Sequence, residues 1–312
     1  MSNVLEVEHL RVEFRRAGEV VVPVRDVSFA VGEKARVALV GESGCGKSLT
    51  ALSVARLPPI DRAHLSGNIT SRGRVAYIFQ NPSEALNPVM RICDQIREAF
   101  PQRMSRAAGE QKIIDLLTRT GLADPVRAAH SFPCELSGGQ QQRCMIAMAL
   151  AAEPTLLIAD EPTTALDVTT QAQVLDLIDS LATQLGMAVL LITHNLGLVA
   201  SRTDVVNVMY AGTIVESGPV TEVLANPRHP YTKGLAGAVP RLGAPRDALL
   251  QDISGTVPPP NAWPSGCAFH PRCPQAKTVC PLAFPPKIVY NNTTVFCHLY
   301  NNTTKGENIH EH

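Results

Sequence analysis

The sequence has no excess of charge of either sign. Its 312 residues contain 28 lysines and arginines and 28 aspartates and glutamates, so the formal net charge at pH 7 is zero. Domains that bind nucleic acid usually carry a basic surface, and this composition gives no indication of one, so we expect no nucleic-acid partner. A chain of this length suggests about two domains and is long enough to bury a core.

Long hydrophobic runs are also absent. The longest, such as residues 144–152 and 156–159, end well short of the roughly 20 apolar residues that a membrane-spanning helix needs. Residues 1–6 lack a basic stretch followed by an apolar run, so we expect no signal peptide and a cytoplasmic chain. Any membrane association is then expected to come through a partner.

Cysteine is sparse over most of the chain and concentrated near its end. In a reducing cytoplasm, such a concentration indicates a metal site rather than disulfides. The spacing C-x5-C-x6-C-x16-C lacks the close C-x2-C pairs of common zinc ribbons, which leaves an iron–sulfur cluster, zinc and free thiols as alternatives. The scattered cysteines are Cys45, Cys93, Cys134 and Cys144, and the concentrated ones are Cys267, Cys273, Cys280 and Cys297. Cys45 lies near Lys47 and a predicted helix N-terminus, so it is either a reactive cysteine with a favoured thiolate or a small filler side chain.

The stretch GESGCGKS at residues 41–48 matches the phosphate-loop spacing G-x-x-x-x-G-K-[ST]. It lies between an apolar run and a helix-compatible stretch, as this motif requires. Glycines let successive backbone N–H groups converge on phosphate oxygens, and the positive end of the helix faces the same anion. Lys47 would reach the β and γ phosphates, and the Ser48 hydroxyl would bind Mg²⁺. The predicted nucleotide-binding residues here are Gly41, Glu42, Ser43, Gly44, Cys45, Gly46, Lys47 and Ser48.

Two carboxylates follow the apolar run of residues 155–159. A buried parallel strand that ends in acids can present them to a bound nucleotide. Asp160 fits the aspartate that holds Mg²⁺, and Glu161 is placed to polarise an attacking water.

Polar residues also follow two other apolar runs. Gln80 follows residues 74–79 and precedes the turn signal Asn81-Pro82. His194 follows residues 188–193, although a lone histidine is more often structural than catalytic. Ligands of α/β folds collect at the carboxyl edge of the sheet, so both side chains are candidates for the nucleotide site.

The stretch LSGGQ at residues 136–140 precedes a helix-prone run. Ser137 is either an ordinary helix N-cap or, with Gly139, part of a second anion site at a helix N-terminus. Residues 90–120 have apolar positions at helical spacing and little β character. We interpret them as part of a separate helical subdomain.

Residues 4–14 and 20–31 alternate polar and apolar in places, which is typical of strands in an antiparallel layer. Phe14 in the first of them either packs in the core or stacks on a flat base.

Taken in order, these motifs resemble the ATPase subunit of an ABC transporter over about residues 4–225. The resemblance rests on the phosphate loop, Gln80, LSGGQ, LLIADEP, residues 164–167 and Thr193-His194. It implies that LSGGQ binds the γ-phosphate of ATP held by an opposing subunit, so that complete sites need two ATPase domains face to face. It also implies that Phe14 stacks on adenine, that Gln80 links the nucleotide to membrane subunits, and that Asp167 is a dimer contact.

Residues 84–88, 158–173 and 226–232 and the cysteine-bearing tail further resemble dipeptide and oligopeptide importer ATPases. The resemblance implies a second related ATPase as partner, two membrane permease subunits, an extracytoplasmic binding protein, and a place at the cytoplasmic face of the inner membrane. It also implies a [4Fe-4S] cluster on the four clustered cysteines. Nickel complexes, opines and glutathione remain alternative cargoes. Soluble ABC ATPases usually carry a long insertion or two ATPase units, and neither is present.

We therefore predict an α/β fold, a P-loop ABC ATPase with a RecA-like core, an antiparallel β layer and an inserted helical subdomain. The core is assigned to residues 1–80 and 137–225 and the helical subdomain to 81–136. Residues 226–312 are assigned to a small irregular metal-binding extension with a disordered tail. The predicted cofactors are ATP, Mg²⁺ and the cluster, with zinc as the alternative.

Overall fold

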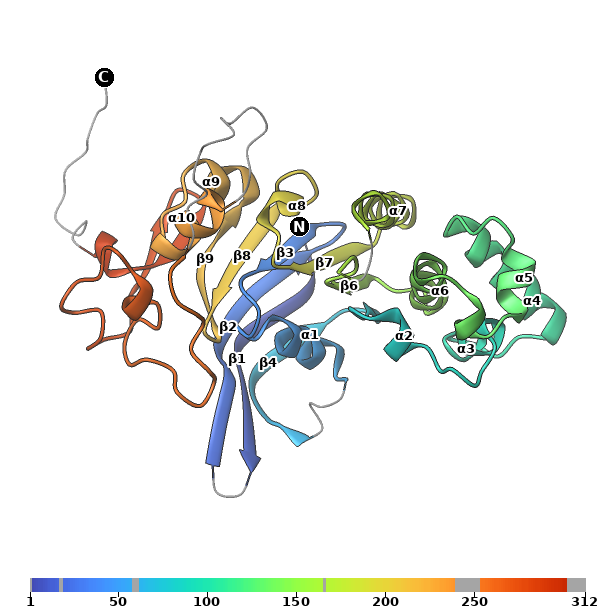
Figure 1. The fold of residues 1–312 in the computed structure, drawn as a ribbon, viewed down its shortest axis with the longest axis horizontal. Helices are drawn as coiled ribbons and strands as arrows, with labels where there is room; N and C mark the ends of the chain where they lie inside the picture. Colours follow the sequence, from blue (N-terminus) through green and yellow to red (C-terminus); the bar gives the residue numbers. More distant parts are fainter. Residues whose placement is uncertain (1, 17–18, 58–61, 165–166, 239–252, 302–312) are drawn as a thin grey trace. The chain divides into compact units, whose positions relative to one another are not determined.

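A computed structural model gives the fold of the chain (Figure 1), and describes residues 2–16, 19–57, 62–164, 167–238 and 253–301. The predicted disordered tail, residues 305–312, lies outside these ranges. The chain forms two compact units. The first comprises Met1–Val7, Ala30–Arg36 and Ile69–Ile192, and the second Glu8–Phe29, Val37–Asn68 and Thr193–His312. These units do not test the predicted domain boundaries, which remain a prediction.

The strands that lie wholly or partly in the second unit follow the order β4-β1-β2-β9-β8-β3. Strand β3 pairs in parallel with β8, with Val37 opposite Val205 and Val40 opposite Val208, and β8 pairs antiparallel with β9. The predicted strands at residues 4–14 and 20–31 are confirmed as β1 and β2. The strands are β1 (Asn3–Arg16), β2 (Glu19–Gly32), β3 (Arg36–Val40), β4 (His64–Ser71), β8 (Val205–Tyr210) and β9 (Thr213–Pro219).

The C-terminal extension adds to this sheet. Strands β10 (Lys287–Tyr290) and β11 (Thr293–Phe296) form an antiparallel hairpin, and β11 pairs with β9, with Thr294 opposite Ser217. Helix α9 (Val220–Ala225) precedes the extension, and helix α10 (Pro230–Gly237) lies within it (Figure 1). The extension is therefore less irregular than its sequence predicts, because pairing with β9 gives a short segment of weak periodicity a strand partner.

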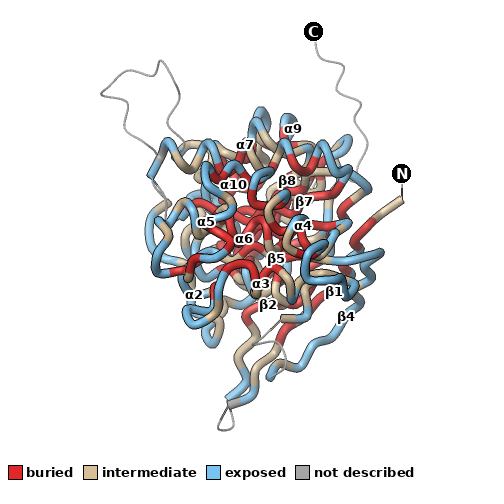
Figure 2. The backbone as a smooth tube through the Cα atoms, turned by 90° about the vertical axis from the view of Figure 1, so that its right-hand side faces the viewer, coloured by how far each residue is buried: buried red, intermediate tan, exposed pale blue. Residues whose placement is uncertain are grey.

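The first unit contains three parallel strands, β5 (Val75–Ile78), β6 (Leu156–Asp160) and β7 (Ala188–Thr193), with β6 in the middle. Every residue of β6 and β7 is buried, as their continuous apolar runs predict, and they contribute to the buried interior coloured red in Figure 2. The carboxyl ends of the three strands lie at one edge, which is the edge that presents the predicted catalytic side chains.

Residues 90–120, which are predicted to be helical, contain the two helices α3 and α4. The predicted run over residues 90–120 is interrupted between α3 and α4, because Pro101 disfavours a helical conformation at Phe100. The helices are α1 (Lys47–Ala55), α2 (Pro82–Ala85), α3 (Ile92–Glu98), α4 (Arg106–Arg119), α5 (Pro125–His130), α6 (Gly138–Ala151), α7 (Val168–Leu185) and α8 (Leu196–Ala200), with 3-10 turns at Pro133–Glu135, His270–Arg272 and His298–Tyr300.

Three buried aromatic side chains tie the extension to β8 within the second unit. The ring of Phe269 lies 5.2 Å from that of Tyr210 on β8 and 5.4 Å from that of Tyr231 on α10, measured between centroids. The two tyrosine rings lie 4.7 Å apart. Truncating a buried aromatic side chain typically costs about 3–5 kcal/mol, so this cluster holds the extension in place.

His229, at the start of α10, is buried and neutral. Its Nδ1 accepts a hydrogen bond from the backbone N–H of Tyr231 at 3.1 Å. Burial disfavours the charged imidazolium and lowers the pKa of His229 to about 3. The unfolded chain, with its ordinary histidine pKa near 6.5, therefore binds more protons than the folded chain as the pH falls below that value.

We expect His229→Asn to weaken the acid sensitivity of the fold. Asparagine keeps an acceptor at the N-cap but cannot take up the proton. In the wild type this group should remove about 1.4 kcal/mol of unfolding free energy for each pH unit below 6.5. The measurement is denaturant unfolding at pH 7 and pH 5, with exposed His9→Asn as control. Parallel pH profiles for His229→Asn and wild type would contradict the assignment.

Candidate nucleotide site

The phosphate loop joins β3 to α1 and exposes one of its sides. Gly44 has a φ of 83°, and a Cβ added there would meet no atom within 4 Å. Ser43, Gly44 and Ser48 are exposed, whereas Cys45 is buried. The loop therefore presents backbone and hydroxyl groups to an open space, as a phosphate cradle requires.

The base of the loop lies tightly against β8. A Cβ added to Gly41 would lie 2.2 Å from the carbonyl oxygen of Met209. Only glycine permits this approach of two backbones. The contact determines where the loop leaves β3.

Lys47 is buried, with 5% of its surface exposed, and its ammonium stays at the loop. Nζ donates to the carbonyl oxygens of Gly41 at 2.8 Å and Glu42 at 3.0 Å. These bonds hold a positive charge at the loop, and the predicted contact of Lys47 with phosphate remains a prediction.

Cys45 does not have the stabilised thiolate that its neighbours in the sequence predict. Burial raises the pKa of its thiol, and the lowering effect of Lys47 is smaller. The expectation of a reactive cysteine is therefore wrong, because the side chain is fully buried and its thiol stays protonated.

We expect a maleimide to label exposed Cys134 quickly and Cys45 slowly, with or without MgATP, because a buried neutral thiol is a poor nucleophile. Peptide mapping of the full chain after brief labelling gives the two rates. Cys134→Ser serves as the control that removes the fast site. Rapid labelling of Cys45 in the folded protein would contradict this assignment.

In the first unit, the parallel register of β5 and β6 brings Gln80 and Glu161 together. Gln80 Nε2 donates to Glu161 Oε2 at 3.2 Å, and Thr164 Oγ1 donates to the same oxygen at 2.9 Å. Glu161 has a φ of 43°, in the left-handed region. Such strain in a non-glycine residue costs on the order of 1–3 kcal/mol and is concentrated at functional sites.

Asp160, at the end of β6, is buried and accepts a hydrogen bond from the Tyr77 hydroxyl at 2.7 Å. Burial and the neighbouring Asp160 carboxylate raise the pKa of Tyr77, which stays a neutral donor. Tyr77 has no role predicted from the sequence, and Thr164 is named there only as part of the motif at residues 164–167. The sequence signal for Tyr77 is that it is the one hydroxyl-bearing residue of the apolar strand β5. No sequence signal points to the hydrogen bond of Thr164.

Ser137 is the N-cap of α6, which confirms the helix-cap interpretation. Its hydroxyl accepts from the Gln140 N–H at 3.4 Å, and its own N–H donates to Gln140 Oε1 at 2.9 Å. The second interpretation, an anion site, remains a prediction. Gly138 is exposed and a Cβ there would meet nothing within 4 Å, so this helix start is open.

Asp167 similarly caps α7, because its carboxylate accepts from the backbone N–H and the hydroxyl of Thr170 at 3.0 and 2.7 Å. These hydrogen bonds lower the pKa of Asp167. Phe14 is half-buried on β1, and His194 is exposed directly after β7. Their predicted contacts with adenine and γ-phosphate remain predictions.

The predicted site residues are divided between the two units. Hydroxyl, amide and carboxylate oxygens are suitable donors for Mg²⁺, so the chemistry of Ser48, Gln80 and Asp160 fits that ion. Their joint coordination of Mg²⁺ remains a prediction. The first unit contains Gln80, Ser137, Gly139, Asp160 and Glu161, and the second contains Phe14, residues 41–48 and His194.

The four clustered cysteines lie in the extension, with Cys280 and Cys297 buried. Burial, together with the smaller effect of charges on the other three thiols, raises the pKa of Cys267 to about 11. Among the described residues, no group of three or more His, Cys, Asp or Glu side chains is arranged to hold a metal ion. This geometry does not support the predicted [4Fe-4S] cluster or zinc.

Known proteins resemble the chain over most of its length. The family described as "ABC transporter" matches residues 24–164, and "Oligopeptide/dipeptide transporter, C-terminal region" matches residues 215–280. The dipeptide transport ATP-binding protein DppD of Bacillus subtilis is 41% identical over 320 residues, covering 96% of this chain and 95% of DppD. A Brucella ovis protein named for peptide import and ATP binding is 46% identical over 315 residues, covering 91% of this chain and 93% of that protein.

Solved structures share the fold. The dimeric ATP-binding cassette MJ0796 bound to ADP and Pi gives a TM-score of 0.60 at 22% identity, covering 69% of this chain and 98% of that chain. The cbiO1 protein from Clostridium perfringens gives 0.60 at 24% identity, covering 72% and 92%. The fold and the phosphate loop define an ABC ATPase. Within this class, the chain belongs to the ATP-binding proteins of the peptide importer family. Throughout the described ranges, each helix is too short or too polar to span a membrane.

Proposed function

We propose that this ATPase drives the uptake of dipeptides and oligopeptides. The observation that carries the proposal is the match of residues 215–280 to the C-terminal region of oligopeptide and dipeptide transporters, downstream of a phosphate loop and a strained Glu161. The names of the relatives DppD and the Brucella ovis protein support the same substrate class.

In the proposed mechanism, the amides of the phosphate loop and the Lys47 ammonium bind the phosphates of ATP. Mg²⁺, held by Ser48, Gln80 and Asp160, would neutralise charge on the phosphoryl group in transfer. Glu161 orients and polarises the water for in-line attack, and His194 contacts the γ-phosphate.

Hydrogen bonds within the first unit position this chemistry. Gln80 and Thr164 both donate to one carboxylate oxygen of Glu161, which fixes the position of this carboxylate. Tyr77 holds Asp160 in a similar manner. A change in the position of Gln80 would therefore break or redirect its hydrogen bond to Glu161, the residue proposed to polarise water.

The proposed assembly contains two ATPase subunits, two membrane permeases and an extracytoplasmic binding protein, with the ATPases at the cytoplasmic face of the membrane. The exposed start of α6, with Ser137 and Gly139, suits binding of a phosphate held by a second ATPase subunit. We propose a related but different chain as that second subunit.

Reconstitution with the cognate permeases and binding protein in proteoliposomes tests the function. We expect ATP-dependent uptake of labelled dipeptide or oligopeptide and stimulation of ATP hydrolysis by the loaded binding protein. Nickel complexes, an opine and glutathione are the comparison cargoes. Transport of one of these without peptide uptake would overturn the peptide assignment while retaining the importer. ATP hydrolysis without any need for the permeases would favour a soluble ABC ATPase instead.

We further propose, on the resemblance of the cysteine-bearing tail to peptide-importer ATPases, that Cys267, Cys273, Cys280 and Cys297 take up a [4Fe-4S] cluster, with zinc as the alternative. Anaerobically purified protein should then be brown, contain iron and acid-labile sulfide, and lose both in Cys273→Ser. Colourless protein with neither iron nor zinc would overturn the proposal and leave four free thiols.

A further inference from the structure

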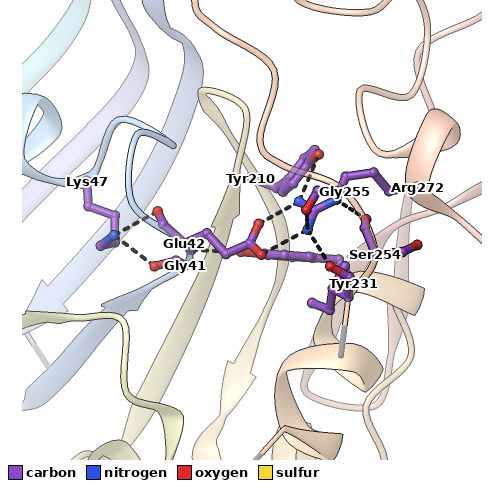
Figure 3. A network of polar contacts seen from close by, with 9 residues as sticks. Gly41, Glu42, Lys47, Tyr210, Tyr231, Ser254, Gly255 and Arg272 are labelled. Carbon is purple, nitrogen blue, oxygen red and sulfur yellow. Dashed lines mark hydrogen bonds and ion pairs between the residues drawn. The ribbon is translucent and has the colours of Figure 1, made fainter. Parts of the chain in front are cut away.

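Glu42, the second residue of the phosphate loop, is held at each of its polar groups (Figure 3). Its carboxylate oxygens accept from Arg272 at 2.6 and 3.0 Å. Its N–H donates to the Tyr231 hydroxyl at 2.8 Å, and its carbonyl accepts from Lys47 Nζ. The residue therefore connects the lysine that faces the phosphates with a part of the chain 230 positions away.

Arg272 is itself rigidly held within the extension. Its side chain is 6% exposed, whereas that of Glu42 is 29% exposed. Its guanidinium also donates to the carbonyl oxygens of Ser254 at 2.9 Å, Ile253 at 3.0 Å and Gly255 at 3.1 Å. These bonds leave the guanidinium little freedom to follow a moving loop. They also match the fixed fork of arginine, which lysine does not reproduce.

Charge makes this contact important for ATP. A carboxylate at the second position of a phosphate loop would repel the nucleotide if it were not neutralised. Arg272 both neutralises the Glu42 carboxylate and keeps it on the side of the extension. Removing one partner of a partly buried ion pair leaves the charge of the other uncompensated, which is more damaging than removing both.

We propose that Arg272 is a positioning residue for the ATP site: through its ion pair with Glu42, the C-terminal extension sets the geometry and the charge of the phosphate loop, and hence the affinity for ATP. The inference rests on the proposed binding of ATP by this loop. Its consequence is that displacement of the extension weakens ATP binding.

The test is a double-mutant cycle of MgATP binding to the full-length chain, in a Glu161→Gln background so that bound ATP persists. We expect Arg272→Met to raise the Kd for ATP about tenfold, because Glu42 is left charged beside the phosphates. Glu42→Gln should raise it by only about threefold, and adding Glu42→Gln to Arg272→Met should recover most of the loss. Arg272→Lys should lie between Arg272→Met and the parent.

Trp263→Phe is the matched control in the same extension. It removes the 2.8 Å hydrogen bond from the indole Nε1 to the Val22 carbonyl without touching the phosphate loop. We expect a lower thermal stability and an unchanged Kd for ATP.

Two results would overturn the inference. One is equal ATP affinity of Arg272→Met and the parent chain. The other is a double variant whose Kd for ATP is raised by the product of the two single effects. Such additivity would indicate general destabilisation and not an uncompensated charge on Glu42. If Arg272→Met fails to fold, the same double-mutant cycle of MgATP binding is made with Arg272→Lys and Glu42→Gln. Absence of ATP binding by the parent chain would instead refute the proposed nucleotide site.

Discussion

Glu161→Gln should reduce ATP hydrolysis by the assembled transporter by about 10²–10⁴-fold while ATP still binds. Glutamine keeps the size of the side chain and can accept the hydrogen bonds from Gln80 and Thr164. It lacks the negative charge that polarises the attacking water. The measurement is steady-state phosphate release beside equilibrium binding of MgATP.

Glu153→Gln is a suitable control for this substitution. Glu153 is also a glutamate in the left-handed region, with a φ of 49°, but its carboxylate pairs with Lys112 instead. We expect it to hydrolyse ATP at the wild-type rate. Normal hydrolysis by Glu161→Gln would remove Glu161 from the mechanism, unless the partner ATPase provides the hydrolysis. Making the matching substitution in the partner separates these two cases.

Gly41→Ala should lower ATP affinity more than tenfold, because the added Cβ would lie 2.2 Å from the Met209 carbonyl oxygen. A backbone atom cannot move aside as a flexible side chain can, so the loop or β8 must shift. Overpacking of this kind typically costs about 1–3 kcal/mol, and here the displaced atoms belong to the phosphate loop itself. Binding of MgATP and the thermal midpoint should be measured together.

Gly32→Ala is the matched glycine control. The nearest atom to its added Cβ is the Ala35 Cβ at 3.7 Å, an ordinary van der Waals distance. We expect it to leave both the affinity and the midpoint unchanged. If Gly41→Ala bound ATP as tightly as Gly32→Ala, the close approach of the loop to β8 would not constrain the site.

The sequence alone determined the elements around the nucleotide chemistry, because these signals are local. A phosphate loop needs its glycines and lysine at consecutive positions, and a buried parallel strand needs a continuous apolar run before its acids. The positions of α1, β6 and β7 therefore agree with the predictions. The helix cap at Ser137 was also predictable, since the Gln140 that completes it is three residues away.

Tertiary structure decided the features that depend on distant residues. The neighbours of Cys45 predicted a thiolate, but the packing of the loop buries the side chain and raises the pKa of its thiol. The Tyr77 hydroxyl meets Asp160 only because β5 and β6 pair in parallel. Arg272 reaches Glu42 across 230 positions, and no periodicity or motif encodes that pairing. A motif specifies which groups can meet a phosphate, whereas the packing of distant segments specifies which charges surround it.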